Sequence, residues 1–169
     1  MSDPNTDILN HAVQDPSGGE SQLLQQLLTF RISRVNARLN AQALRILRRT
    51  TGLTLTQWRI LVALDALGDS SLSRIVEATQ MHKAMVSRTV KSMLQQGLLQ
   101  TKRNPKDMRA HILGMTVAGR GQYDIARPAM RQRQIALRAA IGEDNVAGLL
   151  SALDLLDDHF DKLKVYDQI

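Results

Sequence analysis

Along most of the chain, apolar residues recur every three or four positions, which is the spacing of one face of an α-helix. From Gln22 to Thr50 this pattern predicts a helix about 40 Å long, with a narrow apolar stripe and arginines on its other faces. Shorter stretches predict helices over residues 53–64, 71–79, 82–96, 116–140 and 146–163, several of which begin at Ser or Thr and end before Gly. The pattern therefore indicates a mainly α-helical protein.

Between the helices predicted over 82–96 and 116–140, the pattern changes to alternation. Two alternating segments, Leu98–Lys102 and Arg109–Met115, flank a polar loop over residues 103–108. Such a pair of segments around a turn predicts a β-hairpin. Helix, short helix, turn, helix and hairpin in this order indicate a winged helix-turn-helix, so the predicted fold is mainly α with a small β-hairpin wing.

The predicted elements divide the chain into three kinds of region. Residues 1–21 hold Pro, Gly and acidic residues and almost nothing apolar, which is typical of a flexible arm. Residues 51–116 form the predicted winged helix-turn-helix. The long helices within residues 22–50 and 117–169 carry apolar stripes that one small domain cannot bury, so we expect them to form a dimerisation region with a second copy of the chain.

Composition excludes several classes of protein. Of the 169 residues, 43% are hydrophobic and only 3% are aromatic, which suits a helical core of aliphatic side chains. The absence of cysteine excludes disulfides, thiolate zinc sites and thiol switches. No apolar run approaches the length of a membrane span and the N-terminus lacks the features of a signal peptide, so we expect a cytoplasmic protein with no membrane partner.

Charge is unevenly distributed along the chain. The net charge is +6, but residues 1–21 carry −4, residues 22–140 carry +15 and residues 141–169 carry −5. A solvated basic surface is the simpler interpretation of the middle section. Solubility alone does not require so high a charge, however, and a polyanion such as double-stranded DNA is the expected partner.

The second half of the predicted winged helix-turn-helix carries the residue types that DNA recognition needs. A helix that enters the major groove must expose hydrogen-bond donors on one face and keep its apolar residues on the other. The positions expected to point inward are Met85, Val86, Val90, Met93 and Leu94. The residues expected to bind DNA, from this helix and from the hairpin, are His82, Lys83, Ser87, Arg88, Lys91, Lys102, Arg103, Lys106 and Arg109.

Three segments resemble the MarR family of bacterial transcriptional regulators, named for the multiple antibiotic resistance regulator. Residues 53–64 are similar to the family's second helix, with the sequence LTLTQWRILVAL. Residues 72–99 are similar to its helix-turn-helix, with the sequence LSRIVEATQMHKAMVSRTVKSMLQQGLL. Residues 104–120 are similar to its wing and the start of its next helix, with the sequence NPKDMRAHILGMTVAGR. The resemblance covers roughly residues 23–160.

This resemblance implies a homodimer that represses transcription, and many members of the family release DNA when a small aromatic acid binds. It implies that Ser87 and Arg88 enter the major groove. The wing carries the family's Asp-x-Arg pattern as Asp107 and Arg109. Arg109 is either braced by Asp107 or inserted into the minor groove. The sequence departs from the family at Met108, where a basic residue is frequent, and this departure removes at most one phosphate contact.

Other classes of function are less consistent with the sequence. An enzyme is not expected, because the four histidines are scattered and neither a His-Glu-x-x-His helix nor a Gly-rich phosphate loop is present. We expect no metal and no cofactor, since Asp157, Asp158 and Asp161 on one helix lack the loop carbonyls of a calcium site. The alternative that remains open is a non-regulatory, nucleoid-type DNA-binding protein.

An effector pocket is predicted where the first two helices meet. Guanidinium groups beside apolar walls suit an aromatic carboxylate, because the charge binds the carboxylate and the walls bind the ring. The residues assigned to this pocket are Phe30, Arg31, Arg34, Trp58, Arg59 and, from the second strand of the hairpin, His111. In the alternative interpretation the arginines are surface charges or pair with acids such as Asp124, and His111 is a packed or surface residue.

Overall fold

In the computed structural model the described residues are 26–104 and 107–166, without the side chains of residues 104–110 and 164–166. The predicted acidic arm, residues 1–21, lies outside this range. The elements in chain order are α3 (Leu28–Thr50), α4 (Leu55–Leu67), α5 (Leu72–Thr79), α6 (Lys83–Gln95), β1 (Leu99–Asn104), β2 (Asp107–Met115), α7 (Val117–Ile141) and α8 (Glu143–Tyr166). The fold is mainly α-helical with a two-stranded antiparallel hairpin, as predicted. Within the described ranges no helix is long and apolar enough to cross a membrane.

Local capping residues explain where the helices begin. The Thr54 hydroxyl accepts a hydrogen bond from the Gln57 backbone N–H at 3.2 Å, and the Gln57 side chain accepts one from the Thr54 N–H at 2.8 Å. This reciprocal pair is a capping box, and it starts α4. Ser71 and Thr116 cap α5 and α7 in the simpler way, each accepting from the N–H three residues on. The starts predicted at Ser71 and Thr116 are confirmed, and of the two candidate caps for the second helix, Thr54 and Thr56, the structure uses Thr54.

Two predicted elements differ from the structure. The helix predicted from Gln22 is interrupted at Leu27, whose backbone is extended, so α3 begins at Leu28 and is about 35 Å long. Gln26, before this break, is helical, and the predicted start over residues 22–25 lies outside the described residues. The predicted loop over residues 103–108 is too long. The strands β1 and β2 remain paired as far as Asn104 opposite Asp107, with an irregularity in the register just before that pair. Cross-strand pairing thus extends the hairpin into residues whose polarity suggested a loop.

Helix α4 lies at the centre of the winged-helix lobe, which we define as residues 55–115. It packs against α5, α6, β2 and the neighbouring helices α3 and α7. The buried side chains of the core are Leu47, Leu53, Trp58, Ile60, Leu61, Ala63, Leu64, Ile75, Met81, Val86, Val90, Met93, Leu99, Leu113, Tyr123 and Ala126. This core reaches from the end of α3 through the lobe into the first half of α7, so the lobe is continuous with the long helices.

Met85 was expected in this core and is instead 41% exposed. The buried face of α6 is set by Val86, Val90 and Met93, which follow the helical repeat. Met85 lies about 100° around the helix from Val86 and so falls at the edge of that face. Its sulfur accepts a hydrogen bond from the Thr56 hydroxyl at 3.6 Å, which places it beside the start of α4.

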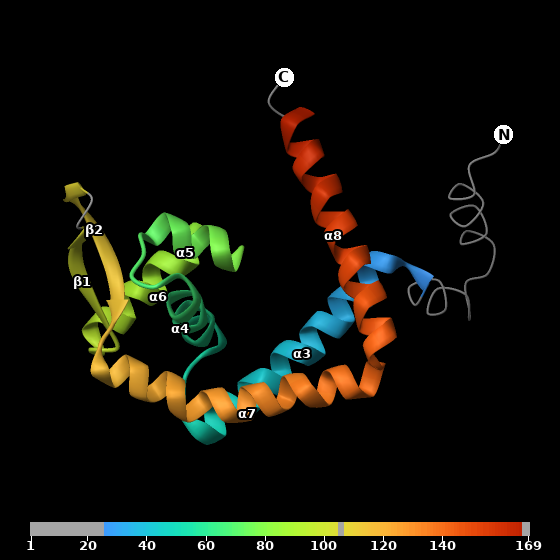
Figure 1. Ribbon diagram of the computed structural model, residues 1–169, viewed down its shortest axis with the longest axis horizontal. Coiled ribbons are helices and arrows are strands. Elements are labelled where there is room, and N and C mark those ends of the chain that lie inside the picture. The colour runs from blue at the N-terminus through green and yellow to red at the C-terminus, as the bar shows by residue number, and fades with distance from the viewer. Residues whose placement is uncertain (1–25, 105–106, 167–169) are drawn as a thin grey trace, which may run out of the picture.

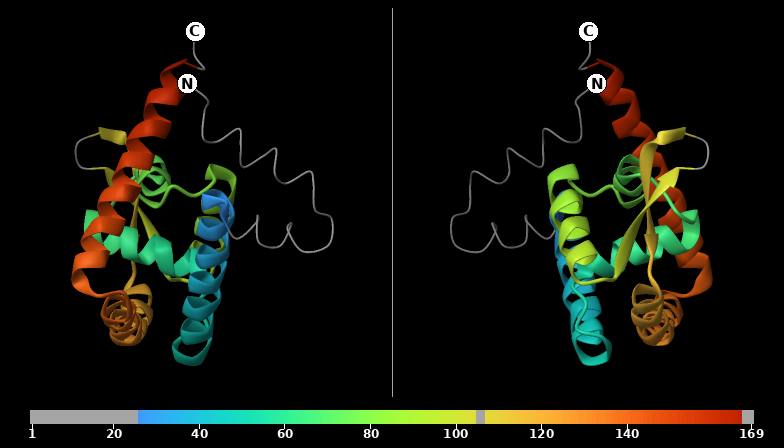
Figure 2. Two further views of the ribbon diagram at one scale, coloured as in Figure 1. Left: turned by 90° about the vertical axis from the view of Figure 1, so that its right-hand side faces the viewer. Right: turned by 90° about the vertical axis from the view of Figure 1, so that its left-hand side faces the viewer.

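The long helices extend away from the lobe. Figure 1 shows α7 running from the base of the hairpin along the lower edge of the molecule, with α8 turning upward at its far end. Helix α3 packs against α7. In the two side views α3 is upright and α7 is seen nearly end-on, so the two helices cross at an angle (Figure 2). The lobe and α8 therefore stand at opposite ends of α7.

The start of α7 is pressed against the junction between α6 and β1. The Thr116 hydroxyl donates to the Gly97 carbonyl at 2.6 Å, and the Thr116 N–H donates to the Leu98 carbonyl at 3.1 Å. A Cβ atom built on Gly119 would lie 2.0 Å from the Leu98 carbonyl oxygen. Glycine at position 119 is therefore required by a backbone–backbone contact, whereas a Cβ on Gly121 would meet nothing within 4 Å.

These two glycines give a matched test of that contact. We expect Gly119→Ala to lower the free energy of unfolding by about 1–3 kcal/mol, because two backbone segments would have to separate. Gly121→Ala should raise it by about 0.5–1 kcal/mol through the better helix propensity of alanine. Heat or urea unfolding of both variants measures the difference, and equal effects at the two positions would contradict the proposed role of the contact.

Candidate nucleic-acid interface

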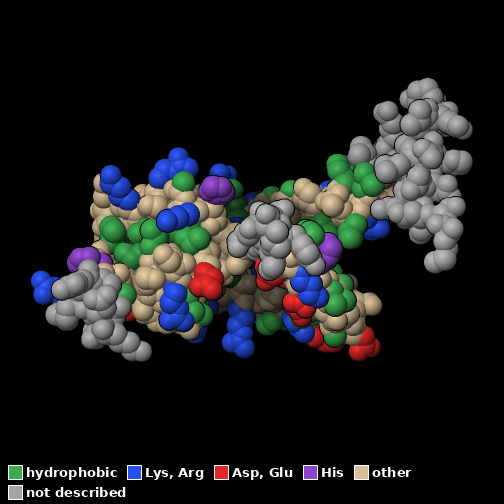
Figure 3. Space-filling model, turned by 90° about the horizontal axis from the view of Figure 1, so that it is seen from above, with side chains coloured by type: hydrophobic (Ala, Val, Ile, Leu, Met, Phe, Trp, Pro, Cys, Tyr) green, Lys and Arg blue, Asp and Glu red, His purple; other side chains and the backbone are tan. Residues whose placement is uncertain are grey.

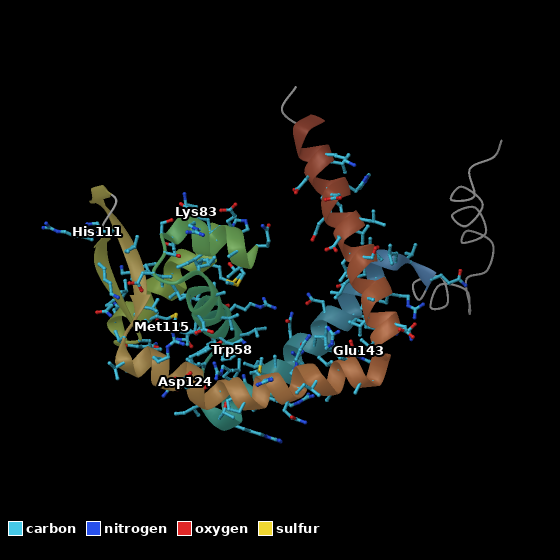
Figure 4. The ribbon with its side chains drawn as sticks, in the orientation of Figure 1. Trp58, Lys83, His111, Met115, Asp124 and Glu143 are labelled. Atoms are coloured by element: carbon cyan, nitrogen blue, oxygen red, sulfur yellow. The ribbon has the colours of Figure 1, made fainter. Side chains whose placement is uncertain are left out.

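Helix α6 presents a polar face to solvent. Because Val86, Val90 and Met93 are buried, the residues on the opposite side of the helix are forced outward. Ser87, Arg88 and Lys91, which are predicted to bind DNA, occupy that side and are exposed, and the other two predicted residues, His82 and Lys83, are exposed at the start of the helix. Figure 4 shows Lys83 on the upper edge of the lobe, at the start of α6. An exposed row of donors on a helix supported by a packed core is the arrangement that major-groove reading requires.

The hairpin adds exposed basic residues beside α6. Lys102 and Arg103 on β1 are both exposed, and the Lys102 ammonium pairs with the Asp69 carboxylate at 2.6 Å. Lys106 lies outside the described residues, as do the side chains of Asp107 and Arg109. The roles assigned to these three residues therefore stay predictions.

Charge separates the two ends of the molecule. Seen from above, Lys, Arg and His side chains are spread over the lobe, whereas Asp and Glu gather mainly around α8 (Figure 3). The sequence of α8 contains six acidic residues, whereas that of the lobe contains nine Lys and Arg against four acids. The surface that carries α6 and the hairpin is thus the one suited to a polyanion.

A polar contact fastens the lobe to α7. Asp65 on α4 accepts hydrogen bonds from the Arg120 guanidinium and, at 2.7 Å, from the Tyr123 hydroxyl. These bonds hold the pKa of the Asp65 carboxyl below its ordinary value. Burial, together with the bond to Asp65, raises the pKa of Tyr123 to about 12. The Tyr123 ring also stacks on Trp58, with centroids 5.2 Å apart and planes 16° from parallel.

A cavity of about 260 Å³ lies between α3, α4 and α7, next to this contact. Its lining residues are Asn36, Leu39, Asn40, Ala43, Leu55, Trp58, Arg59, Met130 and Arg133. The lining combines apolar side chains with amides and two guanidinium groups, and no carboxylate is among these residues. Such a composition is typical of a site for a small organic anion.

Neither guanidinium in the cavity is neutralised by an acid in the described part of the chain. Arg59 donates to the Asn40 side-chain oxygen at 2.8 Å. Arg133 donates to the Gln42 side chain at 3.1 Å and to the Leu39 carbonyl at 3.0 Å. Burial lowers the pKa of Arg133 from its ordinary value. Two uncompensated positive charges in a half-buried cavity favour an anion there.

The structure brings together only part of the predicted effector pocket. Trp58 and Arg59 line the cavity as expected. Phe30, Arg31 and Arg34 do not, because they lie on the exposed first turns of α3, before the residues that face α4. His111 is exposed on the hairpin, far from Trp58 (Figure 4). These four residues thus do not line this cavity, and their assignment to an effector site stays a prediction.

Sequence reasoning missed two features of the site. Arg133 is one of five arginines on α7, and nothing local distinguishes the one that reaches across to α3. The contact between Asp65 and Arg120 joins residues 55 positions apart, so no spacing rule predicts it. Asp124, the expected alternative partner for Arg31 and Arg34, forms no ion pair with them among the residues described.

Comparison with known proteins agrees with this geometry. A mainly helical chain with a hairpin beside an exposed, donor-rich helix is a winged helix-turn-helix protein. Residues 51–110 match the model of the MarR family. Comparison with curated protein sequences gives no match.

Solved structures with the same fold are numerous. A MarR/EmrR family transcriptional regulator from Acinetobacter sp. ADP1 has 24% identity and a TM-score of 0.76, over 82% of this chain and 98% of that one. The transcriptional repressor CouR, bound to a 23-mer DNA duplex, has 26% identity and a TM-score of 0.71, over 85% of this chain and 99% of that one.

CouR bound to p-coumaroyl-CoA gives a similar match, with 25% identity and a TM-score of 0.70 over 85% of this chain and 98% of that one. BpsR of Bordetella bronchiseptica, whose DNA binding is regulated by 6-hydroxynicotinic acid, has 22% identity and a TM-score of 0.61, over 75% of this chain and 98% of that one. Residues 51–110 thus match the MarR family model, and the described chain has the fold of the MarR-family transcriptional regulators it resembles.

The contact between Asp65 and α7 predicts a pH-dependent stability. A carboxyl whose pKa is lowered by folding stabilises the protein above the unfolded-state pKa of about 3.9, and this stabilisation is lost as the pH falls through the folded-state pKa. Asp65→Asn should therefore lower the unfolding free energy by about 1 kcal/mol at pH 7, or roughly 2–4 °C, and by much less near pH 3. The control is Glu77→Gln, an exposed change expected to be neutral at both pH values. A deficit of Asp65→Asn that is equal at the two pH values would contradict this prediction.

Proposed function

We propose that this protein is a transcriptional repressor that binds a pseudo-palindromic operator as a homodimer and is released by a small aromatic acid. The observation that carries the DNA-binding part is the exposed donor face of α6, supported by a packed core and flanked by a basic hairpin. The likeness to CouR, a repressor solved on a DNA duplex, supports the same function at 26% identity.

Sequence reading is assigned to the middle of α6. Ser87 and Arg88 lie at the centre of the exposed face, where a helix in the major groove approaches the base edges. The Arg88 Nε donates to the Ala84 carbonyl at 3.3 Å, so the guanidinium lies along its own helix and still offers two terminal amino groups. Lys83 and Lys91, one turn to either side, are suited to the phosphates that flank the bases.

The homodimer is supported by apolar surface that one chain leaves uncovered. On α8 only Val146 is buried among the described side chains, while its large apolar residues beyond that point are exposed or half-buried. The first half of α3 likewise exposes Leu28, Phe30 and Ile32. Basic α3 and acidic α8 are also complementary in charge, so each can cover the other helix in a second copy.

The effector is assigned to the cavity between α3, α4 and α7. A carboxylate bound by Arg59 and Arg133 would leave the aromatic ring against Leu39, Trp58 and Met130. At about 260 Å³ the cavity is at the small end of ligand sites, which favours a single-ring acid over a coenzyme A thioester. The ligands named for BpsR and CouR support an aromatic acid or its thioester as the chemical class.

The acid would release DNA if it bound more tightly to a conformation of the dimer that cannot bind the operator than to the conformation that can. The cavity is lined by the helix α4 of the lobe and by the two long helices α3 and α7. A ligand that changes the angle between them changes the spacing of the two α6 helices in the dimer. The operator requires half-sites about one turn of DNA apart, so a change of spacing weakens binding.

Selection of DNA fragments from the organism's own genome tests the proposed function. The purified protein should select a pseudo-palindromic site and bind it at least about 10³ times more tightly than bulk DNA. Arg88→Ala should cost about 1–3 kcal/mol and relax the preference at one position of each half-site. A protein that binds all fragments alike would instead be the nucleoid-type alternative.

Light scattering tests the homodimer. At micromolar concentration the expected mass is about twice the 18.8 kDa of the chain. Leu153→Glu and Phe160→Glu, both on the exposed face of α8, should shift the protein toward monomer, since a charge would have to be buried in the apolar interface. Leu155→Glu, on another side of the same helix, is the control. A folded wild-type monomer would refute the homodimer.

Titration with benzoate, salicylate and 4-hydroxycinnamate tests the effector. The acid that binds should raise the unfolding temperature and weaken operator binding by about 5- to 150-fold. Arg59→Met and Arg133→Met should abolish both effects, whereas Arg31→Met, outside the cavity, should leave them intact. If none of the acids stabilises the protein at millimolar concentration, or if Arg31→Met abolishes the response equally, the assigned effector site is wrong.

A further inference from the structure

The hairpin is attached to the rest of the lobe by an ion pair that the sequence does not predict. Asp69 follows Gly68 in the loop between α4 and α5, and Lys102 lies on β1. The Lys102 Nζ and the Asp69 Oδ2 are 2.6 Å apart, with side chains 43% and 37% exposed. Lys102 was expected to contact DNA, but here its charge faces a carboxylate of its own chain.

Two further features fix the position of the Asp69 carboxylate. The next residue, Ser70, forms an isolated antiparallel bridge with Leu113, with hydrogen bonds of 2.9 and 2.8 Å between their backbones. The loop thereby joins the edge of β2. A Cβ on Gly114 would lie only 2.3 Å from the Asp69 Oδ1, so the carboxylate occupies the space that a side chain at position 114 would fill.

Register explains why Lys102, and not its neighbour, meets Asp69. Lys102 is opposite Ile112, and Gly114 is two residues further along β2, so all three lie on one face of the hairpin. Arg103 is opposite His111 and therefore lies on the other face. Arg103 is exposed and makes no ion pair among the described side chains. Adjacent basic residues of β1 thus have different surroundings.

We propose that Asp69 is a positioning residue, which holds the base of the wing against the α4–α5 loop through Lys102, and that Arg103 rather than Lys102 provides the phosphate contact of β1. This inference rests on the proposed DNA-binding function. If Lys102 bound a DNA phosphate instead of Asp69, the Asp69 carboxylate would be left unpaired beside a second negative charge, which is unfavourable. Arg103 forms no ion pair among the described side chains, so binding a phosphate would not separate it from a carboxylate.

The position of the wing relative to α6 depends on this attachment. Ser71, the N-cap of α5, comes directly after the bridge at Ser70, and α5 packs against α6. A hairpin held to this loop is held at a defined distance from the recognition helix. The wing and α6 can then contact neighbouring parts of one duplex at the same time. Because the wing is already held in place, binding does not cost the conformational entropy of fixing it.

The salt dependence of DNA affinity distinguishes the two roles, because each phosphate contact contributes about 0.9 to the slope of log K against log salt. The measurement uses the full chain and a duplex taken from the selected genomic fragment. Arg103→Gln should lower the slope by about 0.9 per wing. Lys102→Met should leave the slope unchanged and lower affinity by about two- to fivefold per protomer, the range of an exposed ion pair.

Asp69 and Lys102 should act as one unit. Asp69→Asn should lower affinity by the same factor as Lys102→Met, and the double variant should lose no more than either single variant. Gly114→Ala should reproduce this loss by displacing the carboxylate, and should have no effect in an Asp69→Ala background. An Asp69→Asn variant that binds DNA more tightly, or a Lys102→Met variant whose slope falls as far as that of Arg103→Gln, would overturn the proposal.

Amide hydrogen exchange in the free protein tests the attachment without DNA. The Leu113 N–H, bonded to the Ser70 carbonyl, should exchange faster in Asp69→Asn and Lys102→Met and at the wild-type rate in Arg103→Gln. Unchanged exchange in all three variants would refute the attachment itself. If exchange responds as expected but no duplex is bound by any variant or by the wild type, the proposed function fails and the attachment stands as a structural feature alone.

Discussion

The contact between α4 and α7 fixes where the winged-helix lobe sits. Asp65, Arg120 and Tyr123 form its polar part, and Trp58 stacked on Tyr123 forms its apolar part. Close to the hairpin, the start of α7 adds a backbone contact in which Gly119 touches the Leu98 carbonyl. Without these contacts the lobe and the long helices would have no defined angle, and neither the presentation of α6 nor the shape of the cavity would be determined.

The cavity and the reading helix are built on the same lobe without sharing a residue. The cavity lining comes from α3, α4 and α7 and includes no residue of α6. A molecule bound there cannot compete for the donors of α6 directly and acts only through the position of α4 against the long helices. In the proposed function, this separation would allow the ligand chemistry and the DNA sequence preference to vary independently, since different side chains would determine each.

Features that depend on neighbouring residues could be predicted from the sequence, and features that depend on distant ones could not. The caps at Ser71 and Thr116 follow from local hydrogen bonds and could be located to the residue, and the cap of α4 could be narrowed to Thr54 or Thr56. The exposed face of α6 follows from helical periodicity. Met85 is misassigned to the core because its apolar character is given more weight than its position, about 100° around the helix from Val86. Arg133 and Asp69 act across gaps of more than 30 residues, and only the packed chain reveals their partners.

Trp58 is the single tryptophan of the chain, buried against Tyr123 and lining the cavity. The protein therefore carries its one indole fluorophore, which can be excited separately from tyrosine, at the joint between the lobe and α7. Its emission originates from one environment, so a change in intensity or wavelength reports on that joint without an added label. The indole lies against the buried Tyr123 ring and close to the Arg59 and Arg133 guanidinium groups. Entry of water or of an aromatic ligand into the cavity would change these surroundings and therefore the emission of Trp58.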